Sequence, residues 1–293
     1  MADEFMEVVL GHWDAWEDGA IVQDKSTGLF AHPDKVHRLD YKGKFFKSRG
    51  PFTVPRSPQG HPVVIQAGAS GRGIRFAGRW AELIFAAFPD AEAGKRTYAA
   101  LKQSIADAGR DPDLVKITPR VWTVAAETKS EAEDKWALAD SLPNDMDALS
   151  LLSEVLNFDL AVKGLDEPFT DDDLAGMSGG HSMRDLVVRV SGKQNPTVRD
   201  FMQVTRRGRA QVPFVGGPKE VADQMEQWFV EGSCDGFVIT ATHVPGSYED
   251  FVRFVVPELQ RRGLARKEYT GSTLREHLGL RRPENGAWRN RAG

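Results

Sequence analysis

The chain has 293 residues, of which 41% are hydrophobic and 27% are charged, an ordinary composition for a globular protein. Its formal net charge of −4 is too small to favour a nucleic acid or an anionic membrane as partner. The single cysteine, Cys234, excludes an internal disulfide and is typical of a reducing compartment, so we expect a cytoplasmic protein. The acidic N-terminus does not resemble a secretory signal, and no apolar run reaches the roughly 18 residues that a membrane span requires.

The first elements predicted along the chain are a helix and a hairpin. Residues 3–17 repeat apolar side chains with the period of a helix, and a helix with so much apolar surface needs a packing partner. Residues 36–54 alternate loosely around Lys42 and Gly43, which predicts a β-hairpin.

Strands then alternate with helices along most of the chain. The predicted strands are residues 63–67, 81–88, 115–126 and 235–242. The predicted helices cover residues 71–79, 94–113, a segment that begins at Pro218, and 247–263. This alternation predicts an α/β fold with parallel strands and helices packed outside them. Four strands are half of the eight that a closed (β/α)₈ barrel needs.

The helix predicted over residues 247–263 carries three local signals. Ser247 and Asp250 have the spacing of a capping box at its start. Pro257 should kink or divide it, and Gly263 ends it.

Residues 127–213 form a long insertion between the third and fourth predicted strands. Its first part predicts two helices, whereas residues 171–197 are rich in Gly, Ser and Asp and have weak periodicity. A long loop inside a compact domain is usually a functional lid or is disordered, so we expect residues 165–213 to act as a lid.

The turn after the first predicted strand is the strongest candidate binding site. In the run PVVIQAGASGRG, the strand is followed by Gly68, Ala69, Ser70, Gly71 and Arg72. Glycines let a ligand approach the main chain, and the free N–H groups at the start of the next helix favour an anion. The Ser70 hydroxyl is a further donor, so the turn predicts a phosphate site. The alternative is a plain strand-to-helix turn in which Ser70 caps the helix.

Other candidates are weaker. His243 follows the fourth predicted strand and could contact a ligand or move a proton, although a solvent-facing loop histidine is the expected role. The histidines show no paired ligand spacing, so we expect no metal site. The basic tail could contact RNA or a membrane surface, but a solvated arm or a subunit contact is the expected role.

Several longer runs resemble one family of flavin enzymes. The run RGPFTVPRSPQGHPVVIQAGAS, followed by GIRFAGRWAELIF, is similar to the nitrilotriacetate and dibenzothiophene-sulfone monooxygenase branch of the bacterial-luciferase-like enzymes. Further matches are ADEFMEVVLGHWDAWED, GPKEVADQMEQWF, FVRFVVPELQRRGL and YTGSTLREHLGL. The resemblance implies a (β/α)₈ TIM barrel with insertions and an FMN-dependent, two-component monooxygenase of a small organic substrate. A separate NAD(P)H:flavin reductase would supply reduced FMN, and O₂ would be the co-substrate.

The resemblance also assigns a role to the glycine-rich turn. In the family, the serine of QAGAS binds the FMN phosphate, which carries over onto Ser70. Gly71 and Arg72 would offer neighbouring backbone N–H groups, and Gly68 and Ala69 complete the turn. No position here matches a catalytic residue of the family, so the catalytic residues stay unknown.

The resemblance implies a particular domain organisation. In the family, the segment like ADEFMEVVLGHW follows four earlier β/α units, so we expect residues 1–293 to be the C-terminal part of one luciferase-like domain. This incomplete barrel would hold about four parallel strands, a β-hairpin, the insertion at 127–213 and a C-terminal arm at 266–293.

Three hypotheses about function follow from these expectations. The first is a monooxygenase whose activity is lost in the isolated fragment or depends on a homo-oligomer or a complementing N-terminal half. The second is a non-catalytic flavin-binding or assembly module built from half-barrels, which would show no coupled substrate oxygenation. The third and weakest is a nucleic-acid-binding protein that uses residues 281–293, whose binding would depend on salt.

Overall fold

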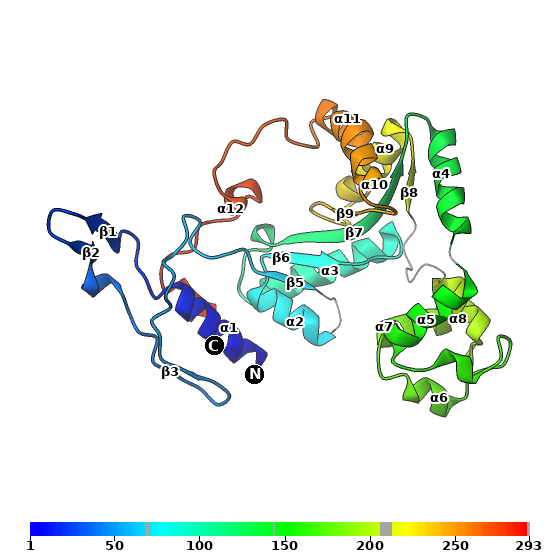
Figure 1. Cartoon of the computed structure of the whole chain (residues 1–293), viewed down its shortest axis with the longest axis horizontal. Helices are drawn as coiled ribbons and strands as arrows, with labels where there is room; N and C mark the ends of the chain where they lie inside the picture. The colour runs from blue at the N-terminus through cyan, green and yellow to red at the C-terminus, as the bar shows by residue number, and fades with distance from the viewer. Residues whose placement is uncertain (68–70, 143, 206–212, 292–293) are drawn as a thin grey trace.

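The computed structural model describes residues 1–67, 71–142, 144–205 and 213–291 (Figure 1). Its strands are β1 (Ile21–Asp24), β2 (Leu29–Ala31), β3 (Tyr41–Lys42), β4 (Lys47–Ser48), β5 (Ile65–Ala67), β6 (Leu83–Ala86), β7 (Lys116–Ala125), β8 (Phe214–Gly216) and β9 (Val238–Thr240). Its longer helices are α1 (Ala2–Trp13), α2 (Gly71–Trp80), α3 (Ala91–Asp107), α4 (Lys129–Ser141), α5 (Asp145–Leu156), α7 (His181–Ser191), α8 (Val198–Thr205) and α9 (Pro218–Val230). Shorter helices are α6 (Asp171–Gly176), α10 (Gly246–Asp250), α11 (Val256–Arg261) and α12 (Leu274–His277).

The centre of the molecule is a five-stranded parallel sheet. The strand order is β5-β6-β7-β8, and β9 also pairs with β7. The four strands predicted from the sequence are confirmed as β5, β6, β7 and β9, and the α/β class with parallel pairing is confirmed with them. The expected count of about four is too low, because the three-residue strand β8 was missed. A run as short as Phe-Val-Gly carries no readable period.

Helices cover one face of this sheet. Ile117 of β7 belongs to a core cluster with α2 and α3, whereas Val121 and Ala125 pack against α9 and α11. Alternate residues of a strand point to the same side, so all four helices lie on one face, with α2 and α3 near β6 and α9 and α11 near the far end of β7 (Figure 1). Trp122 therefore points to the opposite face. Ile65, on that second face, is 60% exposed.

The apolar stripe of α1 packs against the C-terminal segment of the same chain. Met6 and Leu10 of α1 form a cluster with Trp80 of α2 and Trp288 near the C-terminus. The two termini consequently lie side by side (Figure 1). A fully solvated arm is therefore wrong for the described part of the tail, because Trp288 is 8% exposed, whereas the alternative of a subunit contact stays a prediction.

Two antiparallel hairpins follow α1. The predicted hairpin around Lys42 and Gly43 is confirmed as β3 paired with β4, although each strand has only two residues. A second hairpin, β1 with β2, was missed. Its turn is held by the Asp24 carboxylate, which accepts hydrogen bonds from the side chains of Ser26 and Thr27, each at 2.7 Å.

The insertion is a helical bundle with a core of its own. The two helices predicted in its first part are confirmed as α4 and α5. The expectation of an unstructured loop over residues 171–197 is wrong, because α6 and α7 lie there. The fully buried members of its core include Leu152, Leu156, Leu160, Phe169, Met177 and Phe201. Leu152 and Leu156 repeat with the period of a helix in α5, whereas Phe169, Met177 and Phe201 join this core from segments far apart in the sequence.

The last long helical segment differs from the expectation at its start. The predicted capping box is wrong, because α10 begins at Gly246 and the Ser247 hydroxyl accepts a hydrogen bond from the N–H of Thr242 instead. The division by Pro257 is confirmed: a π-helical turn at Phe251–Val255 separates α10 from α11. Proline has no N–H and would clash with the carbonyl four residues earlier, and the wider turn relieves that clash.

Candidate functional site at the C-terminal edge of the sheet

The candidate site lies where the parallel strands end and the next helices begin. β5 leads to α2 through the predicted phosphate turn, but Gly68, Ala69 and Ser70 lie outside the described residues. Gly71 and Arg72 are the first two residues of α2, and both are exposed. The predicted helix over 71–79 is thus confirmed, with its N-terminus at the carboxyl end of a buried parallel sheet.

The start of α2 differs from those of neighbouring helices at this edge. α3 is capped by Asp90, whose carboxylate accepts a hydrogen bond from the N–H of Ala93 at 2.7 Å. α4 is closed by a capping box between Thr128 and Glu131. The first turn of α2, in contrast, holds no acidic residue. The N–H groups of this first turn and the positive end of the helix dipole therefore suit an anion there.

Two observations beside the turn fit a group that approaches the main chain. A methyl group added at Gly71 would meet no described atom within 4 Å. Gln66, one residue before the end of β5, has a buried Oε1 that accepts no hydrogen bond from the described residues. A buried acceptor without a donor is costly unless a ligand or water supplies one.

The end of β9 brings a small polar network to the same edge. The Ser247 hydroxyl lies 3.4 Å from the Thr123 carbonyl and 3.1 Å from the N–H of Thr242. The Thr242 hydroxyl lies 3.3 Å from Nδ1 of His243. His243 is exposed, as expected of a loop histidine. Neither Thr242 nor Ser247 was singled out from the sequence, because Ser247 was interpreted as a helix cap.

The first helix of the insertion is tied to this edge as well. Lys135 of α4 makes an ion pair of 2.6 Å with Asp250 and lies 3.4 Å from the carbonyl oxygen of Ala125, the last residue of β7. Both charged side chains are partly exposed. No sequence signal links two residues 115 positions apart, and the contact sets where the insertion leaves the sheet.

Other chemistry has little support in the described chain. Cys234 is 3% exposed, and burial raises the pKa of its thiol to about 12, which disfavours the thiolate of a nucleophile. In the parts of the chain that the structure covers, no group of three or more His, Cys, Asp or Glu side chains could hold a metal ion. No described helix is both long and apolar enough to cross a bilayer.

Comparison with known families shows which family the chain belongs to. Residues 1–235 match the model of the family described as luciferase-like monooxygenase. The chain belongs to the luciferase-like monooxygenase family. The family resemblance inferred from the QAGAS run and the flanking segments is therefore confirmed.

Curated luciferase-like relatives match nearly all of the chain. Nitrilotriacetate monooxygenase component A from Aminobacter aminovorans is 42% identical over 285 residues, which are 97% of this chain and 63% of the relative. Dibenzothiophene-sulfone monooxygenase from Rhodococcus erythropolis is 41% identical over 287 residues, with coverages of 97% and 63%. The chain therefore spans less than two thirds of the length of these relatives.

Solved structures also match nearly all of the chain. The crystal structure of DmoA from Hyphomicrobium sulfonivorans is 34% identical, with a TM-score of 0.84 over 99% of this chain and 62% of that one. A riboflavin lyase solved with modified FMN and riboflavin is 33% identical, with a TM-score of 0.80 over 95% of this chain and 61% of that one. The arrangement of the sheet and its helices is thus shared with luciferase-like enzymes.

Proposed function

We propose that the chain is part of an FMN-dependent, two-component monooxygenase that oxidises a small organic molecule with O₂. The observation that carries the proposal is the position of the α2 N-terminus, at the end of a parallel strand and without an acidic residue in its first turn, in a chain of the luciferase-like family. The riboflavin lyase structure contains modified FMN, and the curated relatives are monooxygenases by name. These names support a flavin-binding site in this chain.

In this proposal the turn from β5 to α2 binds the FMN phosphate. The Ser70 hydroxyl and the N–H groups of Gly71 and Arg72 would donate to the phosphate oxygens, and Gly68 and Ala69 would keep the turn free of bulk. Bound FMN would supply the redox chemistry. The chain's own contribution would be to hold the cofactor in place and, through the 165–213 lid, to exclude water from the reacting groups.

The proposed partners are a flavin reductase and the strands that complete the barrel. A reductase is supported by the name of the Aminobacter relative, which is a component A. Among the described residues, β5 pairs only with β6. Together with the coverage of 63%, this supports an incomplete (β/α)₈ barrel in residues 1–293. A complementing N-terminal half or a homo-oligomer would then supply further strands, because an open sheet edge favours pairing.

A non-catalytic flavin-binding or assembly module is the second candidate. The exposed side chain of Ile65, on the sheet face opposite α2 and α3, favours it, because an exposed apolar side chain at a sheet edge suits assembly with another chain. Such a module would bind FMN through the same turn. It would oxidise no substrate even when a flavin reductase is added.

The first test is a titration with FMN followed by flavin fluorescence. Ser70→Ala should weaken binding by removing a donor. Gly71→Ala should also weaken it, since the added methyl would meet no described atom within 4 Å but would obstruct a phosphate. Gly176→Ala in α6 is the matched control, because its methyl would make ordinary contacts of 3.5 Å with Phe158.

The outcomes separate the candidates. Saturable binding that both turn variants weaken, with unchanged melting temperatures, supports the phosphate site. Coupled substrate oxygenation with an added flavin reductase then distinguishes the monooxygenase from the non-catalytic module. If FMN binds wild type and Gly71→Ala equally, the phosphate does not rest on this turn.

A further inference from the structure

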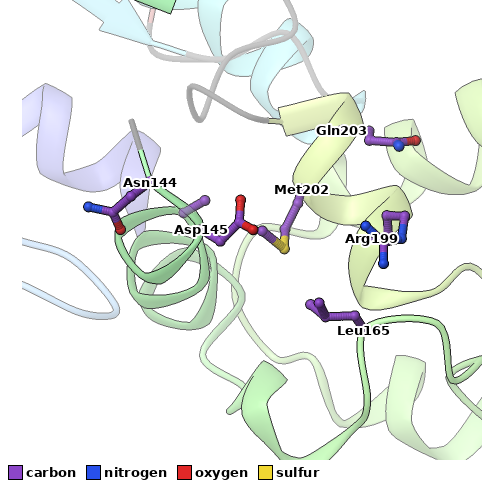
Figure 2. Close-up of a pocket in the computed structure, with 7 residues that line it drawn as sticks. Asn144, Asp145, Leu165, Arg199, Met202 and Gln203 are labelled. Carbon is purple, nitrogen blue, oxygen red and sulfur yellow. The ribbon is translucent and has the colours of Figure 1, made fainter. Parts of the chain in front are cut away.

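A second candidate site lies in the helical insertion, away from the β5–α2 turn. A pocket of about 140 Å³ opens between the start of α5 and one side of α8 (Figure 2). This volume is below the roughly 300 Å³ at which pockets for drug-sized ligands begin. Its size therefore suits a ligand of a few heavy atoms, comparable to an amino acid.

The pocket combines an apolar floor with a charged rim. Ala148 and Met202 line it and are each 8% exposed, and Leu165 adds a further apolar wall. Asp145 on α5 and Arg199 on α8 lie on either side of this floor (Figure 2). A few polar groups that converge over an apolar surface are typical of small-molecule sites.

The two rim charges do not neutralise each other by contact. The Arg199 guanidinium is hydrogen-bonded to Asp166, at 2.6 Å from Nε and 2.9 Å from Nη2. Asp145 acts on the same guanidinium through its charge and not through a hydrogen bond. The pocket thus presents one cation and one anion, separated by the apolar floor.

The present partner of Arg199 can be displaced at little cost. The side chains of Arg199 and Asp166 are 50% and 73% exposed, and exposed ion pairs contribute at most about 1 kcal/mol. A ligand carboxylate could take the place of Asp166 and keep the two-point geometry that arginine favours. Because the pocket wall is partly apolar, the new pair would be less exposed to water than the old one.

We propose that the pocket between α5 and α8 binds a small zwitterion. Its carboxylate pairs with Arg199, its ammonium group pairs with Asp145, and its carbon chain lies on Met202. A plain carboxylate satisfies only one side of the rim, and a plain amine only the other. The site is independent of the flavin turn, so its test needs no FMN.

The experiment is an NMR titration of the full chain labelled with ¹³C at the methionine methyl groups. The probes are ω-amino acids of increasing length, namely glycine, β-alanine, 4-aminobutyrate and 6-aminohexanoate, with butyrate and butylamine as singly charged controls. The signal of Met202, assigned with Met202→Leu, reports occupancy of the pocket. We expect one chain length to saturate the Met202 signal at millimolar concentration, at least tenfold more tightly than either control.

Three variants separate recognition from structure. Arg199→Gln and Asp145→Asn should each weaken binding at least tenfold. Asp166→Asn removes the same ion pair but leaves the guanidinium in place, so it should keep binding or tighten it by up to about fivefold. Arg189→Gln, an exposed arginine on α7, is the matched control and should change nothing.

Two results would overturn the proposal. One is that no probe saturates the Met202 signal, or that butyrate binds as tightly as every amino acid. The other is that Asp166→Asn and Arg199→Gln lose binding equally while melting at the same lowered temperature, because the ion pair would then act only in folding.

Discussion

At the scale of single residues, a buried ion pair joins the C-terminal segment to the sheet. Arg275 and Glu82 are 2% and 6% exposed, and two hydrogen bonds of 2.6 and 3.0 Å connect them. Nε of Arg275 also donates to the carbonyl of His61, and Glu82 accepts from the N–H of Val64. Each charge is therefore surrounded by partners, which is the condition under which a buried pair is tolerated.

Removing one partner of this pair should be costly. Glu82→Gln keeps the shape of the side chain but leaves the Arg275 guanidinium buried without a counter-charge. We expect a loss of about 3–5 kcal/mol in the free energy of unfolding, measured by urea denaturation. Glu284→Gln, an exposed acid on the same segment, is the control and should change stability by less than about 0.5 kcal/mol. A loss below about 1 kcal/mol for Glu82→Gln would mean that water reaches the guanidinium.

Local signals were reliable where one residue decides one conformation. Pro218 does open α9, and Gly109 follows α3 with a φ of +72°, as helix starts and stops predict. Ser247 shows the limit of such signals. Its spacing to Asp250 suits a cap, but the fold places its hydroxyl beside the carbonyl of Thr123, a residue 124 positions away.

At the scale of elements, the C-terminal segment is held to the N-terminal region by surface charges as well as by Trp288. Arg282 contacts Asp18 through two hydrogen bonds of 2.6 and 2.7 Å. Hydrogen bonds from Arg282, helped by the charge of Arg56, hold the pKa of Asp18 below its usual value. The side chain of Asp18 is 58% exposed, so its contribution to stability is small.

This lowered pKa predicts a pH dependence with a definite sign. A carboxyl whose pKa falls on folding stabilises the folded state above its unfolded pKa of about 3.9, and this contribution is lost as pH falls through the folded pKa. The stability difference between wild type and Asp18→Asn should be at most about 1 kcal/mol near pH 7 and constant down to about pH 5. Below about pH 4 it should shrink towards zero. Denaturant unfolding at several pH values checks this, and a difference that grows in acid would contradict it.

Among the elements, those that lie in longer apolar runs were predictable, and most short isolated ones were not. The helix after the phosphate turn and the four longer strand runs follow from apolar patterning. The missed strands are short: β8 has three residues, and β1 and β2 have four and three. The Gly/Ser/Asp-rich part of the insertion was interpreted as a loop because α6 has only six residues and Gly179 and Gly180 interrupt the pattern just before α7.

At the scale of the whole molecule, the insertion bundle and the sheet have separate cores. The cluster around Leu152 and Phe201 contains residues of the insertion alone, and the clusters on the sheet contain none of them. Figure 1 shows the bundle of α5 to α8 beside the sheet and not on it. The two parts can therefore open independently, as separate cooperative units do.

A core substitution in the insertion tests this independence. Leu152→Ala removes a side chain that is 1% exposed and should destabilise the bundle by about 2–5 kcal/mol. Hydrogen exchange should accelerate in α5, α7 and α8 while the amides of β6 and β7 keep their protection. Ile84→Ala, in the sheet core, is the matched control and should have the opposite pattern. Equal acceleration of both parts by either variant would show a single cooperative unit.

The sequence by itself determined the fold class, the parallel strands and the position of the glycine-rich turn, because these depend on apolar period and on residues that stand next to each other. It also predicted the family, since the QAGAS run and its flanks are local. Tertiary structure decided that Trp288 covers α1, that Arg275 pairs with Glu82, and that Asp145 and Arg199 share one pocket. Each of these joins residues far apart along the chain, and only the folded chain fixes such distances.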